Sequence, residues 1–482
     1  MTVPFSIAQP KVHLTDPHDC TDNSDTLSIL HAVFDTLVRR QGRTHVPHVA
    51  ARWNVSQGGR CFTFHLRGAL TFHDGVALDA QAVCENLTRL ARPDKGYTLG
   101  APGVWHQYLG AARITPLDSL TVEIRLPEPV ADLLDVLSQC FLVSPRCFEA
   151  FDEGRFDPYT GSGRYRVSGM TSGCVAAVAN PDHFLPAPAR PAIEWHGQAS
   201  AQKRLEMLRN GDVAVANRVP YDTPSTPAFT VSTYLDPVAI IFLFNCRTGP
   251  LKDPVLRRAL NMAIDRERLI KDVLGGAAVP LDGFVSAHHF GAPVAARPLY
   301  DPEQARGLLQ TSGYDGGLTL KVDCPTRLPD EAELLTVCLG QQLAGFGISL
   351  DITVHPDREA YAHRVRRKEI GDLCVFDSSP MSTFRVLYEK LDARSAGSWW
   401  QGYHNASVEA LLDAGRTTSD DSSREALYQA AYFALRRDPP WLYLYNPLRA
   451  LGGRLEAGVL EMAADGTLDV GQLEIGQLQG GP

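Results

Sequence analysis

The chain has 482 residues, of which 44% are hydrophobic and 21% are charged, so it is long enough for two or three globular domains with large cores. Its formal net charge of -9, without a visible cluster of Lys and Arg, argues against a nucleic-acid partner. No apolar run in the sequence reaches the roughly 18 residues of a membrane span, so we expect no transmembrane helix.

The N-terminal residues MTVPFSIAQPKVHL contain no basic segment, no apolar core and no small-residue cleavage site, so they predict no export leader. The 10 cysteines are scattered singly without a CxxC pair, and most of them lie in apolar runs. Unpaired thiols suit a reducing compartment. We therefore expect a cytoplasmic protein with buried, inert cysteines; if a leader has been removed, the protein is instead periplasmic or extracellular.

The first predicted elements are a strand at residues 5–8, a polar loop, and a helix that Asp25 is expected to cap. The loop carries Cys20, Thr21 and Asp22 at the C-terminal end of the strand, where ligands of open α/β sheets collect. A loop that serves only to start the helix is the alternative interpretation.

Residues 61–75 alternate apolar and polar side chains on both sides of a glycine, which predicts a β-hairpin, and residues 120–126 predict another strand. His65 and His73 lie in the hairpin, but their spacing matches no zinc pattern, so we expect no metal site. Residues 160–167 (TGSGRYRV) lack the GxxxxGK pattern and lead into a strand, which indicates a turn rather than a phosphate loop.

The clearest local signal is the stretch 242–276. A strand is expected to end near Phe244, and two helices follow, the first capped by Asp253 with proline at its first position and the second capped by Asp265. The glycines at 275 and 276 are expected to end the second helix. In the first helix an apolar stripe predicts the buried face, and the other face is expected to carry Arg257, Arg258 and Asn261.

The C-terminal half predicts a β-α-β unit over residues 318–354. A strand at 373–376 then enters a polar run at 377–383, which is followed by a helix at 384–391. An aromatic loop at 399–405 (WWQGYHN) precedes the last predicted helix and strand.

In this order, the motifs resemble those of the extracellular solute-binding proteins of the peptide and nickel type, solute-binding family 5. The resemblance covers nearly the whole chain. It is carried by the tryptophan strand and the hairpin TFHLRGALTFHDG, by TGSGRYRV, by NPDHF, by the stretch from Asn245 to Arg266, and by WWQGYHN.

The resemblance implies an α/β, periplasmic-binding-protein-like fold of two lobes joined by a hinge. Lobe I is expected at residues 1–242 and 446–482, with a β-rich subdomain at about 39–158, and lobe II at residues 245–445. In such a fold the cleft between the lobes is the expected ligand site.

Aromatic rings that stack and a carboxylate that pairs with an ammonium group suit an amine-bearing ligand. Asp377 is the predicted amine anchor, since the family places an acidic residue a few positions before a proline. Arg385 is a candidate partner for a ligand carboxylate, and an ion pair with Glu389 within its own helix is the alternative. The full set of predicted ligand-binding residues is Cys20, Thr21, Trp105, Tyr108, Phe376, Ser378, Ser379, Ser382, Arg385, Trp399, Trp400 and Tyr403.

The favoured function is capture of a small amino-acid or peptide-like ligand by a protein repurposed in the cytoplasm. One alternative is a cofactor-independent enzyme of the Pictet-Spengler type, which joins an arylethylamine such as tryptophan to an aldehyde, with Asp377 or Asp22 as the catalytic base. The other is a substrate-binding protein that delivers peptides to an ABC permease if it is exported. No cofactor is expected, because the sequence shows no cofactor loop and no nucleophile motif.

Overall fold

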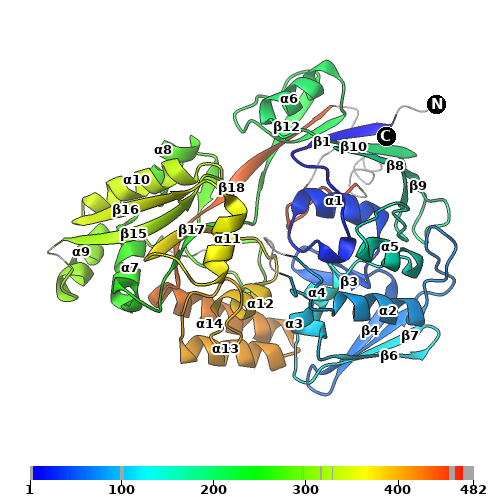
Figure 1. Cartoon of the computed structure of the whole chain (residues 1–482), viewed down its shortest axis with the longest axis horizontal. Helices are drawn as coiled ribbons and strands as arrows, with labels where there is room; N and C mark the ends of the chain where they lie inside the picture. Colours follow the sequence, from blue (N-terminus) through cyan, green and yellow to red (C-terminus); the bar gives the residue numbers. More distant parts are fainter. Residues whose placement is uncertain are drawn as a thin grey trace. The chain divides into compact units, whose positions relative to one another are not determined.

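The computed structural model describes residues 4–97, 102–294, 296, 298–314, 317–327, 329–454 and 462–470. The chain divides into two compact units (Figure 1). Unit 1 comprises Met1–Tyr234 and Arg449–Pro482, and unit 2 comprises Leu235–Leu448. Each unit has its own hydrophobic core.

The main sheet of unit 1 is built around β1, in which Ile7 and Ala8 are fully buried. β1 pairs in parallel with β10 and β11, whereas β9 is antiparallel to both β10 and β8. This puts the carboxyl end of β1, and the loop that follows it, at the edge where parallel strands end. The strands are β1 (Phe5–Gln9), β8 (Tyr165–Thr171), β9 (Cys174–Ala179), β10 (Ala192–Gly197), β11 (Val215–Val219) and β12 (Phe229–Leu235).

A second, antiparallel sheet of unit 1 has the strand order β4-β5-β7-β6, and β2 and β3 form a separate hairpin. Helix α2 lies along the four-stranded sheet (Figure 1). The strands are β2 (Val38–Gln41), β3 (Thr44–Pro47), β4 (Ala50–Ser56), β5 (Cys61–Leu66), β6 (Arg113–Asp118) and β7 (Thr121–Arg125). The helices of unit 1 are η1 (Pro17–Asp19), α1 (Ser24–Val33), α2 (Ala80–Leu90), α3 (His106–Leu109), α4 (Leu133–Leu137), η2 (Pro145–Cys147), α5 (Phe148–Asp152) and α6 (Ala201–Asn210).

Unit 2 is organised around β13, in which all six residues are buried. β13 is antiparallel to both β17 and β18, and β15 is parallel to β17 and β16. The last residues of β18 belong to unit 1, where they pair with β11. The strands are β13 (Ala239–Phe244), β14 (Ala278–Pro280), β15 (Leu318–Pro325), β16 (Ile348–His355), β17 (Leu373–Ser378) and β18 (Trp441–Arg454).

The helices of unit 2 include α13 and α14, which pack against each other (Figure 1). In the part of the chain that the structure describes, no helix is both long enough and apolar enough to cross a membrane. The helices are η3 (Pro250–Lys252), α7 (Pro254–Ala263), α8 (Arg266–Leu274), α9 (Pro302–Thr311), α10 (Ala332–Ala344), α11 (Arg358–Arg366), α12 (Thr383–Val386), η4 (Leu387–Leu391), α13 (Ala406–Thr417) and α14 (Asp421–Arg437).

The capped helix pair that the sequence predicts is confirmed. Asp253 accepts a hydrogen bond from Val255 N at 2.8 Å at the start of α7, and Asp265 accepts one from Arg268 N at 3.0 Å at the start of α8. Gly275 ends α8 with a φ of 59°, in the left-handed region that glycine favours.

The prediction that Arg257 and Asn261 lie on a polar face of α7 is wrong, because both side chains are buried. Arg257 donates to the carbonyl oxygens of Leu251 at 2.8 Å and Pro439 at 2.9 Å, and Asn261 donates to Trp441 O at 2.9 Å. Arg257 also donates to the carboxylate of Asp438. These acceptors satisfy the two buried side chains.

The N-terminal helix α1 is also capped by a different residue than predicted. Asn23, and not Asp25, accepts the hydrogen bond from Thr26 N at 3.0 Å. In unit 2, the helix predicted at 384–391 consists of a short helix, α12, and a π-helical turn, η4, which is closed by Asp392 N donating to Leu387 O at 2.9 Å.

Candidate functional site

The β1–α1 loop of unit 1, residues 16–22, has its path fixed by backbone hydrogen bonds. Gly96 N donates to His18 O at 3.0 Å, and Tyr97 N donates to Asp19 O at 3.0 Å. A distant segment therefore fixes the backbone of the loop at residues 18 and 19.

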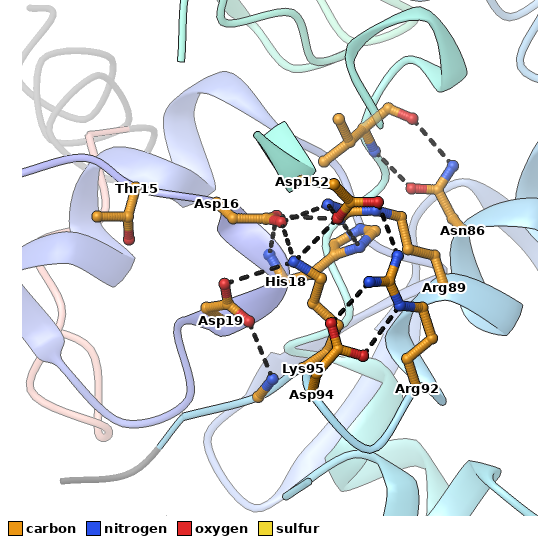
Figure 2. Close-up of polar contacts among 12 residues, drawn as sticks. Thr15, Asp16, His18, Asp19, Asn86, Arg89, Arg92, Asp94, Lys95 and Asp152 are labelled. Carbon is orange, nitrogen blue, oxygen red and sulfur yellow. Dashed lines mark hydrogen bonds and ion pairs between the residues drawn. The ribbon is translucent and has the colours of Figure 1, made fainter. Parts of the chain in front are cut away.

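Side chains of this loop form a buried charge network with Arg89 and Lys95, and Asp16 is its centre (Figure 2). The carboxylate of Asp16 accepts hydrogen bonds from Arg89 Nη2 at 2.5 Å and from Lys95 Nζ at 2.7 Å, and its side chain is only 2% exposed. Burial opposes its charged form, but the charges of Arg89 and Lys95, together with that of His18 in the acidic range where it is protonated, outweigh burial and hold the pKa of Asp16 well below its usual range. Asp16 is therefore ionised at neutral pH.

His18 is a neutral member of this network. Its Nε2–H donates to Phe141 O at 3.0 Å, so its Nδ1 is the acceptor for Arg89 Nη1 at 2.8 Å. Burial lowers the pKa of His18 to about 4, against the opposing charge of Asp16. The imidazole thus contributes an acceptor and no charge at physiological pH.

Asp19 is the carboxyl group of this network whose protonation state changes closest to neutral pH. Gly96 N donates to its carboxylate at 3.2 Å, and Lys95 Nζ lies 3.6 Å away, but 21% of the side chain is exposed. Burial and the neighbouring charge of Asp16 raise the pKa of Asp19 to about 6. This carboxyl group can take up or release a proton near neutral pH, which is the property of a general acid or base.

The predicted residues of the same loop have different surroundings. Thr21 is buried, and its hydroxyl donates to Tyr97 O at 2.8 Å, so it braces the loop. Cys20 and Asp22 are half-buried. Burial of the Cys20 thiol raises its pKa to about 12, which makes it a poor nucleophile.

Trp105 and Tyr108, the other predicted residues of unit 1, are both buried. The indole Nε1–H of Trp105 donates to His18 O at 3.0 Å. Trp105 is therefore attached directly to the β1–α1 loop, whereas Tyr108 lies one turn further on in α3.

In unit 2, the predicted segment begins at the end of β17. Phe376 is buried and Asp377 is half-buried. The negative charge of Asp377 acts on Arg358, where burial lowers the pKa of the guanidinium and Asp377 opposes this shift. The predicted amine anchor thus has a cation in its electrostatic surroundings.

Three serines follow in this segment. Ser378 is buried, and its hydroxyl has no hydrogen-bond partner among the residues that the structure describes. Ser379 is half-buried. Ser382 is buried and caps α12 by accepting a hydrogen bond from Arg385 N at 3.2 Å. Ser382 therefore has a structural role, whereas Ser378 carries an unused donor.

Arg385 is almost completely buried, with 1% of its side chain exposed, and its Nε donates to Glu389 Oε1 at 2.8 Å. This is the ion pair that the sequence left open as the alternative interpretation. A ligand carboxylate at Arg385 stays a prediction.

The aromatic loop also belongs to unit 2. The ring of Trp399 lies 4.9 Å from that of Phe376. Trp400 is half-buried and donates from Nε1 to Tyr403 O at 2.6 Å, and Arg257 lies 5.9 Å above the ring of Tyr403. Trp399 and Phe376 thus bring the two predicted segments of unit 2 together.

Sequence reasoning missed the network of Asp16, Asp19, Arg89 and Lys95, although it selected the adjacent residues 20–22. Asp16 and Arg89 are 73 positions apart, and no short motif connects them. It also missed a cluster of Asp35, His48 and His183, whose ligating atoms all lie within 4.8 Å of one another.

The solved structures that resemble this chain show its fold. They include the ABC transporter-associated periplasmic binding protein DppA from Helicobacter pylori in complex with the peptide STSA, with a TM-score of 0.77, 21% identity, and coverage of 98% of this chain and 97% of the other. NikA from Brucella suis in complex with Fe(III)-EDTA matches with a TM-score of 0.80, 19% identity, and coverage of 97% and 99%. The chain has the fold of the periplasmic binding proteins, as predicted.

The family follows from the sequence match. Residues 44–383 match the family described as bacterial extracellular solute-binding proteins, family 5, middle part. The chain belongs to this family, which confirms the resemblance inferred from its motifs. Among curated proteins, the glutathione-binding protein GsiB of Salmonella paratyphi A is 27% identical over 452 residues, which cover 89% of this chain and 86% of GsiB.

Proposed function

We propose that this protein binds a small solute that carries an amino group, such as an amino acid, a short peptide or an aromatic amine. The observation that carries the proposal is membership of solute-binding family 5 over residues 44–383. Similarity to a protein named for binding glutathione, and to a structure in complex with the peptide STSA, supports a peptide-like ligand.

Two features of unit 2 support a polar, amine-bearing ligand. Asp377 offers a half-buried carboxylate at the end of β17, where an ammonium group gains from a partly desolvated ion pair. The next residue along β17, Ser378, has a buried hydroxyl without a partner among the described residues. Leaving such a group unsatisfied costs stability, and a polar ligand that bonds to it removes this cost.

The test is isothermal titration calorimetry with glutathione, dipeptides, tripeptides, tryptophan and tryptamine, each paired with its N-acetylated form. We expect at least one free amine to bind, and its acetylated partner to bind at least about tenfold more weakly, because acetylation removes the charge that Asp377 recognises. Equal binding of the two forms, or no binding by any free amine, would overturn the proposal.

Asp377→Asn tests the anchor itself. We expect this variant to lose the preference for the free amine while retaining the wild-type fold by circular dichroism. Asp351→Asn on β16 is the matched control, since it removes an exposed aspartate of the same unit, and it should bind like the wild type. If Asp377→Asn kept the full preference for the free amine, another residue would have to be the amine anchor.

Cyclisation of an arylethylamine with an aldehyde is the enzymatic alternative that the sequence left open. Incubating the protein with tryptophan and an aldehyde, and measuring the condensed product by mass spectrometry, separates it from simple binding. Under our proposal the protein does not accelerate product formation. Acceleration that Asp377→Asn or Asp22→Asn abolishes would establish the enzyme instead.

We also propose that the protein works in a reducing compartment. None of the 10 cysteines, all of which lie among the described residues, forms a disulfide, and 6 of them are buried. Such thiols are at risk of mispairing where disulfides form. Fractionating cells that express the complete gene, and detecting the protein in each fraction, tests this. Detection of the protein in the periplasmic or secreted fraction would overturn the proposed reducing compartment. It would favour delivery of the solute to an ABC permease.

A further inference from the structure

Three ligating side chains from distant parts of unit 1 converge on one point. Asp35 follows α1, His48 lies between β3 and β4, and His183 lies in the loop after β9. The Nε2 atoms of His48 and His183 lie 2.6 Å and 3.3 Å from Asp35 Oδ1. The ligating atoms of the three residues all lie within 4.8 Å of one another.

We propose that Asp35, His48 and His183 bind one zinc ion. Two imidazole nitrogens and one carboxylate oxygen form a donor set that zinc accepts, and a fourth, tetrahedral position remains for water. Zinc ligands lie about 2.0–2.2 Å from the ion, so neighbouring ligand atoms of a tetrahedral site are about 3.3 Å apart. The His183–Asp35 separation of 3.3 Å matches this value, and the His48–Asp35 separation of 2.6 Å must lengthen, which a small side-chain movement allows.

The surroundings of the cluster are those of a built site rather than of a chance surface group. The side chains of Asp35 and His183 are 2% and 1% exposed. Ser162 Oγ donates to the second carboxylate oxygen of Asp35 at 2.9 Å, which fixes the orientation of the carboxylate. The ring of Phe184 flanks both imidazoles, with ring centres 4.4 Å from His183 and 5.2 Å from His48.

The competing explanation is a hydrogen-bond network without metal. Leu185 N donates to His183 Nδ1 at 3.1 Å, so in the metal-free chain Nε2 of His183 carries the proton and donates it to Asp35. Zinc takes the place of this proton, the ring changes tautomer, and the Leu185 hydrogen bond is lost. That bond lies in an exposed turn, and its loss is small beside the free energy of zinc coordination.

A bound zinc would tie three segments of unit 1 together: the end of α1, the connection from β3 to β4, and the loop after β9. If zinc binds the folded chain and not the unfolded chain, its binding raises the free energy of unfolding. Removal of the ion is therefore expected to lower the melting temperature of the full chain, which makes stability a second measure of the same site.

The experiment uses the untagged, metal-stripped full chain and titrates zinc against a chromophoric chelator. We expect one zinc per chain, and at least about a tenfold loss of affinity in His48→Gln and in His183→Gln. His45→Gln is the matched control. His45 also lies beside a carboxylate, 3.1 Å from Asp135, but it is not one of the three residues of the cluster. It should bind zinc like the wild type.

Cobalt substitution gives a readout that does not depend on the variants folding. Cobalt in the wild-type chain is expected to show the visible bands of a tetrahedral site without the charge-transfer band of a thiolate ligand, which excludes the cysteines as ligands. Zinc affinity that is equal in the wild type and in His183→Gln, a thiolate band, or no tetrahedral spectrum would each overturn the proposal.

Discussion

Two buried arginines, Arg89 in unit 1 and Arg266 in unit 2, are held in different ways. In unit 1, Arg89 is 5% exposed and is held by the carboxylates of Asp16 and Asp152. In unit 2, Arg266 is equally buried, but its hydrogen bonds go to the carbonyl oxygens of Asn261, Ile264, Leu281 and Tyr443 and to the Asn261 side chain, and the carboxylate of Asp282 lies only at 4.0 Å.

This difference sets how each region responds to mutation and pH. Neutral carbonyls do not compensate a charge, and burial lowers the pKa of Arg266 to about 10. Around Arg89, by contrast, removing one partner strands an opposite charge in the interior, which is the costlier error. Of these two sites, the surroundings of Arg89 are therefore the one whose stability depends on charge balance.

The largest effect is expected from Arg89→Met. This change leaves the Asp16 carboxylate, which is 2% exposed, with Lys95 as its remaining cation at 2.7 Å. We expect a loss of about 3 kcal/mol, at the lower end of the range for breaking a buried ion pair because Lys95 remains. Urea unfolding followed by circular dichroism measures it.

The double variant Asp16→Asn with Arg89→Met is the decisive control. If the stranded charge causes the loss, then neutralising Asp16 should recover part of it, giving a non-additive double-mutant cycle. Strictly additive losses would mean that packing, and not charge, accounts for the effect. Arg92→Met changes an arginine that is 40% exposed, and it should cost less than about 1 kcal/mol.

Arg266→Met should cost less than Arg89→Met, about 1–3 kcal/mol, because it leaves carbonyl oxygens unsatisfied but strands no charge. The same unfolding experiment at pH 5.5 and pH 8 tests whether the loss for Arg266→Met depends on pH. The loss for Arg266→Met should be the same at both values, since its acceptors do not titrate in this range. A loss that changes with pH would show that a group titrating in this range, and not the carbonyl oxygens, is the partner of Arg266.

Asp19→Asn is expected to stabilise the chain at pH 7.5. The pKa of Asp19 is about 6 in the folded chain, against 3.8 for an ordinary aspartate, so the folded chain binds a proton between about pH 4 and pH 6 that the unfolded chain does not. Above pH 6 the ionised carboxylate therefore costs stability, and its removal should gain roughly 2 kcal/mol. Thermal melts at pH 7.5 and pH 5 measure the gain, which should shrink at pH 5.

Asp94→Asn is the matched control for this prediction. Its hydrogen bond with Arg92 lowers the pKa of Asp94, so its ionised form is favoured in the folded chain and its removal should not stabilise. If Asp19→Asn were destabilising at pH 7.5, the attraction of Lys95 would outweigh the burial of Asp19. The pKa of this carboxyl group would then not be raised in the folded chain.

The contrast between these regions also shows what the sequence allows one to predict. The caps at Asp253 and Asp265 and the end of α8 at Gly275 were predictable, because each depends on residues within a few positions along the chain. The family motifs predicted the fold in the same way, as ordered local patterns.

The rest depends on contacts that no local pattern encodes. Arg257 looks like a surface residue in a helical repeat, and only the chain near Pro439, 182 positions away, shows why it is buried. Likewise, nothing near His48 in the sequence indicates that His183 approaches the same carboxylate. Charge networks and groups of possible metal-binding side chains therefore form only when the fold brings such segments together.

The smallest effect on stability is expected at Ser378, in unit 2, where the unsatisfied group is neutral. Its hydroxyl is buried without a partner among the described residues, so Ser378→Ala removes a desolvated polar group together with its cost and leaves a cavity the size of one oxygen atom. We expect the free energy of unfolding to change by less than about 1 kcal/mol, measured by urea unfolding. Ser382→Ala is the matched control, since it removes the cap of α12 and should cost about 1 kcal/mol. If Ser378→Ala destabilised the protein as much as Ser382→Ala, its hydroxyl would already be bonded in the free protein and would not be available to a ligand.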